Sequence, residues 1–284
     1  MARPRTILGL VEGGLASRRQ GLRALARRAT GGGDPELVHD VRVALRRLEA
    51  LARLFRGLPS VGDGREVRGA ARELRRRLSL LRSEEVGRAL LAARASGEDE
   101  ALSALVFPGD PPSARVPAGE LEAVERVAAA WQRRLATALG RPFSPRSATE
   151  AKLLARTRRR LSRRLSELAR LLPPRVETLH AARIAAKRAR YALEVVEPLV
   201  PRAGPLLGSL RAFQDAAGNA HDLLELARRV RNAVSPGDAS SPGSFLGRLE
   251  TECAKAAGSA RRRGEALAVP VRKLRTALRA PGSR

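Results

Sequence analysis

The chain contains one stretch of sequence twice, at an offset of 141 positions. Residues 39–56 read HDVRVALRRLEALARLFR, and residues 180–197 read HAARIAAKRARYALEVVE. Two of the three histidines in the chain, His39 and His180, occupy the same repeated position. Three basic positions also align, namely Arg42 with Arg183, Arg46 with Lys187 and Arg47 with Arg188. Repetition at a fixed spacing is typical of two copies of one structural unit. The repeat therefore predicts a chain built of two related halves.

The sequence as a whole predicts helices. Leu, Ala, Arg and Glu dominate, aromatic residues make up only 2%, and no segment alternates as a β-strand would. The expected helices, separated by Pro- and Gly-rich segments, span residues 5–29, 36–56, 65–94, 119–139, 147–171, 175–197, 204–231 and 244–267, with breaks expected near Glu84 and Gly218 and shorter helices at 98–106 and 270–280. A fainter repeat aligns residues 74–83 with 213–222. We expect an all-α fold of two antiparallel, four-helix-bundle-like repeats, about 1–142 and 143–284, within a single domain.

Each repeated helix carries a buried seam with a row of cations beside it. The seam positions, spaced by three and four residues, are apolar at 38, 41, 45, 48, 52 and 55 and again at 179, 182, 186, 189, 193 and 196. One residue further along, the first copy has His39, Arg42, Arg46, Glu49 and Arg53, and the second has His180, Arg183, Lys187, Arg190 and Glu194. Two such rows facing each other would form a positive trough. Like charges held so close favour a bound anion, which indicates a binding site.

The charge of the whole chain also predicts an anionic partner. It has 55 Lys+Arg against 29 Asp+Glu, for a net charge of +26 and a pI near 11.8. Such a field attracts nucleic acid, anionic membrane or inorganic phosphate polymers. Arginine pairs bidentately with phosphate oxygens, and Lys187 adds a point charge. We interpret His221 as a structural residue, and the charge runs 72–77, 156–164 and 261–263 as solvated faces.

Several classes of protein are disfavoured by the sequence. Cys253 is the only cysteine, so no disulfide within the chain and no cysteine-based zinc cluster is possible. No apolar run reaches the ~18 residues of a membrane span, and the N-terminus lacks the apolar core of a signal peptide. We expect a cytoplasmic protein with no membrane partner.

The repeated motif resembles the CHAD family, the conserved histidine α-helical domain. Its pattern, His-x-x-Arg-(Val/Ile)-x-x-(Arg/Lys)-Arg-x-Arg, is matched by His180, Arg183, Ile184, Lys187, Arg188, Arg190, Tyr191 and Glu194, and by His39, Arg42, Val43, Arg46 and Arg47. A later segment resembles the family's Leu-Gln-Asp…Gly…Asp element through Gln214, Asp215, Gly218 and Asp222. Two positions depart from the pattern. Glu49 stands where the family usually has Arg, and Ser83 follows Arg82 where an Arg-Asp pair is typical.

The resemblance implies two helical halves around a basic central cavity that binds inorganic polyphosphate, and association with polyphosphate granules. The polyphosphate-binding residues it implies are His39, Arg42, Arg46, Arg47, His180, Arg183, Lys187, Arg188 and Arg190, with Tyr191, Arg82 and Arg211 as secondary candidates. It also suggests a separate CYTH-type triphosphate tunnel enzyme, or another polyphosphate-metabolising enzyme, as partner. No catalytic residue, cofactor or metal is expected.

Two other functions stay open at this point. Net charge alone permits a nucleic-acid binder, although the seven aromatic residues are not interleaved with cations as base stacking requires. Non-specific attraction to DNA is expected at low salt. An enzyme acting on polyphosphate, or an accessory subunit of one, is the other alternative, with His39 and His180 able in principle to transfer protons. Against catalysis, the sequence has no P-loop and no metal-binding carboxylate cluster.

Overall fold

The described part of the protein is entirely helical. The computed structural model describes residues 6–31, 36–56, 64–95, 102–109, 116–139, 148–200, 203–234 and 244–279. Its helices are α1 (Ile7–Gly31), α2 (Leu37–Leu54), α3 (Arg65–Ala92), α4 (Leu102–Val106), α5 (Ala118–Leu139), α6 (Ala148–Ala169), α7 (Leu179–Val196), the 3-10 turn η2 (Glu197–Leu199), α8 (Ala203–Ala233) and α10 (Phe245–Arg279). No strand occurs in these ranges, so the all-α prediction is confirmed.

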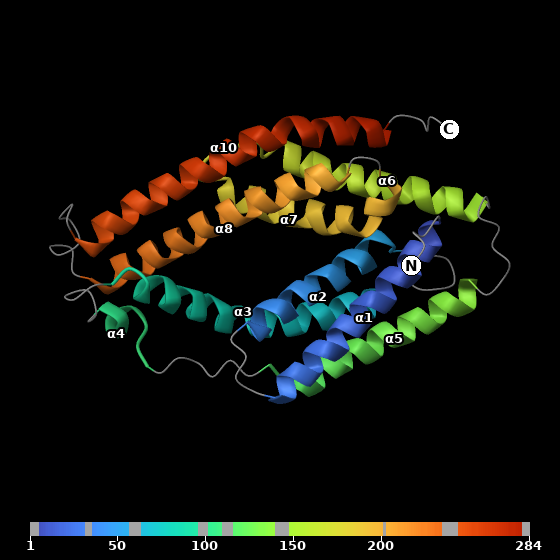
Figure 1. Cartoon of the computed structure of the whole chain (residues 1–284), viewed down its shortest axis with the longest axis horizontal. Helices are drawn as coiled ribbons and strands as arrows, with labels where there is room; N and C mark the ends of the chain where they lie inside the picture. Colours follow the sequence, from blue (N-terminus) through green and yellow to red (C-terminus); the bar gives the residue numbers. More distant parts are fainter. Residues whose placement is uncertain are drawn as a thin grey trace.

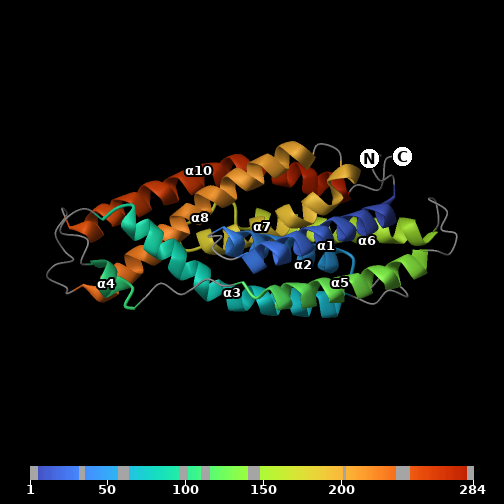
Figure 2. The ribbon, with the colours of Figure 1, turned by 60° about the horizontal axis from the view of Figure 1, so that its bottom comes forward.

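The long helices lie in two groups along an elongated molecule (Figure 1). The first group contains α1, α2, α3 and α5, and the second contains α6, α7, α8 and α10. Within the groups α1 packs along α5, α2 along α3, and α8 along α10. Helices α2 and α7, which carry the repeated motif, pack against each other where the groups meet (Figure 2). Whether the groups are structural repeats of one bundle stays a prediction.

The apolar seams of the two repeated helices are buried in the core of the protein. Every one of their twelve positions, from Val38 to Phe55 on α2 and from Leu179 to Val196 on α7, is buried. The seam of α7 is richer in alanine, and Ala182, Ala186 and Ala189 are fully buried. Because short side chains let helix axes approach closely, α7 packs against α2, α6 and α8 at once. The seam prediction is confirmed.

Three of the expected helix breaks are wrong. Helix α3 continues past Glu84, and α8 continues past Gly218. A Cβ at Gly218 would lie 3.6 Å from Nε of Arg183, an ordinary van der Waals contact, so the glycine sits in the helix without a special backbone role. Helix α10 runs through Pro270, where two separate helices were expected. Buried Leu267 and Val271 hold it on both sides of the proline, and this packing outweighs the lost backbone hydrogen bond.

The start of helix α7 also differs from the prediction. Helix α7 begins at Leu179, not at residue 175. The backbone N–H of Arg175 donates to the Thr178 hydroxyl at 2.9 Å, which forms a turn after Pro173 and Pro174. A proline disfavours helical conformation in the residue before it and has no backbone N–H to donate, so the chain turns before α7 starts.

A buried carboxylate ties the two groups together at the N-terminus of α1. The Glu150 side chain, in the first turn of α6, accepts a hydrogen bond from the backbone N–H of Ile7 at 2.9 Å. This satisfies one of the N–H groups that a helix start leaves without a partner. Across the described ranges, no helix combines the length and hydropathy needed to cross a bilayer.

Candidate functional site

A basic cavity of about 360 Å³ lies between α2, α3, α6 and α7. Among the described residues, sixteen line it, of which ten are cationic and one is acidic. The cations are Arg46, Arg53, Arg56, Arg68, Arg75, Arg160, Arg163, Arg164, Lys187 and Arg188, and the acid is Glu49. Positive charges converging from four elements repel one another, so an anion in the cavity would stabilise the arrangement.

The cations of the α2 wall are held by neighbouring side chains. Burial lowers the pKa of Arg46, although interaction with the hydroxyl of buried Tyr191 opposes this change. Further along the helix, the Glu49 carboxylate contacts Arg53 at 3.4 Å and Arg75 of α3 at 3.1 Å. The guanidinium groups are thereby fixed in place at the cavity wall.

The α6 wall comes from the charge run that the sequence suggested was a solvated face. Arg160 donates to the carbonyl oxygen of Leu54 at 2.7 Å, which places its guanidinium at the end of α2. Burial lowers the pKa of Arg160, and neighbouring arginines lower it further. Arg164 is held by Glu167 at 2.8 Å. Sequence reasoning missed Arg160, Arg163 and Arg164, although their spacing of three and four residues places them on one helix face.

The α7 wall contains the titratable cation of the cavity, Lys187. Burial lowers its pKa to about 7, and repulsion by Arg183, Arg46 and Arg42 acts in the same direction. Asp222 of α8 opposes this change. The position that repeats Lys187 on α2 is Arg46, whose charge is permanent under ordinary conditions. The two predicted rows of cations therefore come close enough to repel each other.

Two histidines meet beside this wall. The ring of His180 lies 4.6 Å, between centroids, from the ring of His221 on α8. Burial lowers the pKa of both, and Arg183 lowers both further. His221 was interpreted as structural, yet the structure places it against a residue of the repeated motif. His39, the repeat counterpart of His180, lies exposed on α2.

Several residues of the predicted site lie outside the cavity. Arg47 and Arg190 contact Glu194 at 3.3 and 3.6 Å, and Arg190 also stacks over the Tyr191 ring at 4.6 Å. Arg211 is exposed on α8, a helix that supplies no described lining residue. The side chain of Arg82 falls outside the described residues, as does that of Ser83. Of the predicted residues, the cavity brings together Arg46, Lys187, Arg188 and Tyr191.

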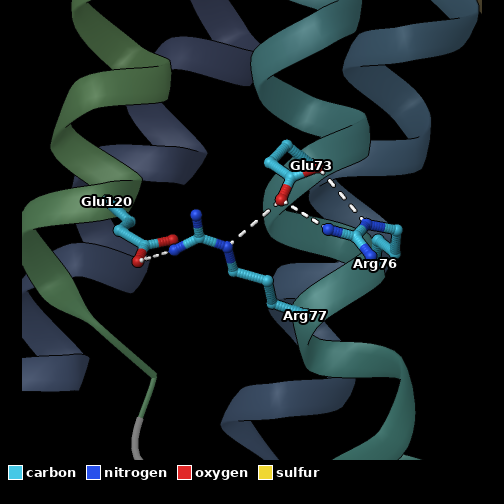
Figure 3. Close-up of polar contacts among 4 residues, drawn as sticks. All are labelled: Glu73, Arg76, Arg77 and Glu120. Carbon is cyan, nitrogen blue, oxygen red and sulfur yellow. Dashed lines mark hydrogen bonds and ion pairs between the residues drawn. The ribbon is translucent and has the colours of Figure 1, made fainter.

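The outer face of α3 shows what an ordinary charged surface of this protein looks like (Figure 3). Exposed Glu73 accepts from Arg76 at 2.9 Å and from Arg77 at 3.3 Å, and these hydrogen bonds lower its pKa. Arg77 also contacts Glu120 of α5 at 2.7 Å. Here acids and bases are matched, whereas Arg75 of the same charge run turns into the cavity. Charges are therefore paired in this cluster, whereas in the cavity the described cations outnumber the acids ten to one.

The cavity offers phosphate-binding groups and little else. Within the described ranges, no three His, Cys, Asp or Glu side chains gather as metal ligands. The apolar part of the lining comes from Ala50, Leu54, Ile184 and Ala192, with the Tyr191 ring between them. Arginine forks approaching from several sides can bind the oxygens of a phosphate chain.

Comparison with known proteins places the chain in a family. The CHAD domain family model matches residues 14–231, and the chain therefore belongs to the CHAD family. Among solved structures, the CHAD domain from the plant Ricinus communis is similar over 100% of this chain and 95% of that one, at 22% identity and a TM-score of 0.62. This similarity shows a shared fold. None of the curated proteins compared with the chain matched it.

Proposed function

We propose that this protein binds inorganic polyphosphate in the basic cavity and does not convert it chemically. The observation that carries the proposal is the set of ten cations and one acid, among the described residues, around a volume of about 360 Å³. Each charge-assisted contact to phosphate contributes about 1.5–3 kcal/mol before the cost of binding is subtracted. Several contacts made together support submicromolar affinity for a long chain.

The shape of the site favours polyphosphate over nucleic acid. A phosphate chain has neither bases nor sugars, so it can enter a cavity between helices, whereas a duplex presents its phosphates on the outside of a wide rod. Single strands are held by aromatic stacking platforms. Trp131 is 1% exposed and Tyr191 is 5% exposed, so neither offers a ring face to a base. DNA is expected to bind only through non-specific, salt-sensitive attraction.

The groups around the cavity support binding without catalysis. The Glu49 carboxylate, a possible base, is engaged by two arginines. The His180–His221 pair lies beside the cavity, and neither histidine is among its described lining residues. On this proposal, any chemistry on the chain belongs to a separate enzyme, such as a CYTH-type or other polyphosphate-metabolising protein, and the binding module directs the protein to polyphosphate granules.

A competition titration tests the proposal. Labelled long-chain polyphosphate is challenged with double-stranded DNA at equal phosphate concentration in about 0.15 M salt, near physiological ionic strength. The wild type is compared with Arg183→Glu/Lys187→Glu and with Arg262→Glu/Arg263→Glu on α10, a helix that contributes no described lining residue. We expect DNA to compete poorly, the first variant to lose binding and the second to keep it. If DNA competes equally and both variants bind alike, polyphosphate is held by diffuse surface charge and not by the cavity.

A further inference from the structure

We propose that Glu49 determines the specificity of the cavity. Its carboxylate occupies cavity arginines, and a phosphate chain can displace it from them, whereas a small anion cannot. In the free protein Glu49 holds two of the cavity arginines, and a ligand must take them over. The cavity would then discriminate against single phosphates and short oligophosphates in favour of long chains. This inference rests on the proposed binding of polyphosphate.

The position of Glu49 in the wall is the first observation. Its side chain is 8% exposed, and its two oxygens are divided between two partners. Oε2 lies 3.4 Å from a terminal nitrogen of Arg53, and Oε1 lies 3.1 Å from Nε of Arg75. Its charge also acts on Arg46, whose pKa it raises against the effect of burial. Glu49 is the one acid among the described lining residues, and it reaches cations on two helices.

The second observation is a reversal of charge order between the two repeated helices. Position 49 on α2 aligns with Arg190 on α7, and position 53 aligns with Glu194. Each helix thus has an ion pair four residues apart, Glu49–Arg53 and Arg190–Glu194, with opposite order. On α2 both members line the cavity, and on α7 neither does. As a result, the carboxylate of Glu49 on α2 lies in the cavity wall, whereas that of Glu194 on α7 lies outside the cavity.

These contacts give the cavity a threshold for its ligand. An anion that binds Arg53 and Arg75 must replace charge-assisted hydrogen bonds already made by Glu49 and approach a negative charge. A single phosphate offers too little charge to offset this. A chain of phosphates brings several adjacent negative charges and engages the other eight cations at the same time. The cost of displacing Glu49 is therefore a large share of the binding free energy for a short ligand and a small share for a long one.

Isothermal titration with tripolyphosphate and with long-chain polyphosphate tests the inference, using Glu49→Gln and Glu194→Gln. Both substitutions remove one negative charge, keep the shape of the side chain and break contacts to two arginines. For Glu49→Gln we expect tripolyphosphate to bind about tenfold more tightly, the effect of one charge-assisted contact, and long chains to gain about threefold. For Glu194→Gln we expect less than a twofold change with either ligand, because its arginines lie outside the cavity.

The possible outcomes are separable. If folded Glu49→Gln binds tripolyphosphate no more tightly than the wild type, or if Glu194→Gln gains as much, the inference is wrong. If the wild type binds neither ligand, the proposed function itself fails. Should Glu49→Gln not fold, Arg75→Gln is compared with Glu49→Gln/Arg75→Gln, in which the lost charges balance. The double variant is then expected to bind tripolyphosphate more tightly than Arg75→Gln, and equal binding would overturn the inference.

Discussion

Helices α2 and α7 carry the same motif but build unequal walls of the cavity. On α2 the wall has Arg46, with a permanent charge, and a carboxylate, Glu49, beside it. On α7 the same positions hold Lys187, whose charge is titratable near neutral pH, and Arg190, which lies outside the cavity. A repeated sequence thus repeats the helix and its buried seam, while the chemistry of the site differs between the copies.

The neighbours of each helix explain the difference. Helix α2 packs against α3, which brings Arg75 to Glu49, while α7 packs against α6 and α8. Helix α6 adds Arg160, Arg163 and Arg164 to the cavity from outside the repeated motif. The site therefore depends on contacts between elements that share no sequence pattern.

The largest expected effect tests whether α6 matters as much as the repeated helices. Arg160→Glu/Arg163→Glu removes two cations from the cavity and adds two negative charges facing the ligand. We expect polyphosphate affinity to fall at least about a hundredfold, since two charge-assisted contacts are lost. Fluorescence anisotropy with labelled polyphosphate measures the loss, and circular dichroism checks the helical content. Unchanged affinity would mean that α2 and α7 alone hold the ligand.

The next effect concerns the titratable cation of α7. Because the pKa of Lys187 is lowered to about 7, the folded free protein loses this charge as pH rises through neutrality, while the unfolded chain keeps it to about pH 10.5. The unfolded state then binds more protons, so this group makes stability rise with pH across that window. Polyphosphate favours the charged form, so affinity should fall up to about tenfold from about pH 6 to about pH 8.

Lys187→Arg is the matched control for this pH dependence, since it gives α7 the same permanent charge as Arg46 on α2. Its affinity should change much less with pH, and the remaining slope would report His180 and His221. Proton uptake on binding is measured by calorimetry in buffers with different ionisation enthalpies. Identical pH profiles for Lys187→Arg and the wild type would exclude Lys187 as the titrating group.

The smallest expected effect separates the two repeated histidines. Both His180 and His39 are exposed, but His180 contacts His221 and lies near Lys187. We expect His180→Ala to weaken polyphosphate binding about threefold, because His180 lies beside the cavity and acts on it through His221 and Lys187, and His39→Ala to change it by less than twofold. Titrations of both variants under one condition give the comparison. Equal losses would indicate that the ligand contacts both copies of the motif alike.

The sequence by itself determined the all-helical class, the apolar seams and the charge of the protein. Periodic apolar positions can bury one face of a helix only, so Val38 to Phe55 and Leu179 to Val196 were predictable from local pattern. The CHAD family was also predictable, because the repeated motif matches its pattern. Charge composition required no structure to predict an anionic partner.

Only the tertiary structure decided which cations share a cavity. Arginine side chains are long, and their direction depends on neighbouring carboxylates and carbonyls that are distant in sequence. Glu194 holds Arg47 and Arg190 outside the cavity, and the Leu54 carbonyl draws Arg160 to its wall. Tertiary packing likewise keeps α10 continuous through Pro270, where the proline predicted a break in the helix. Local pattern specifies which face of a helix is buried, and only the assembled helices specify which charges meet.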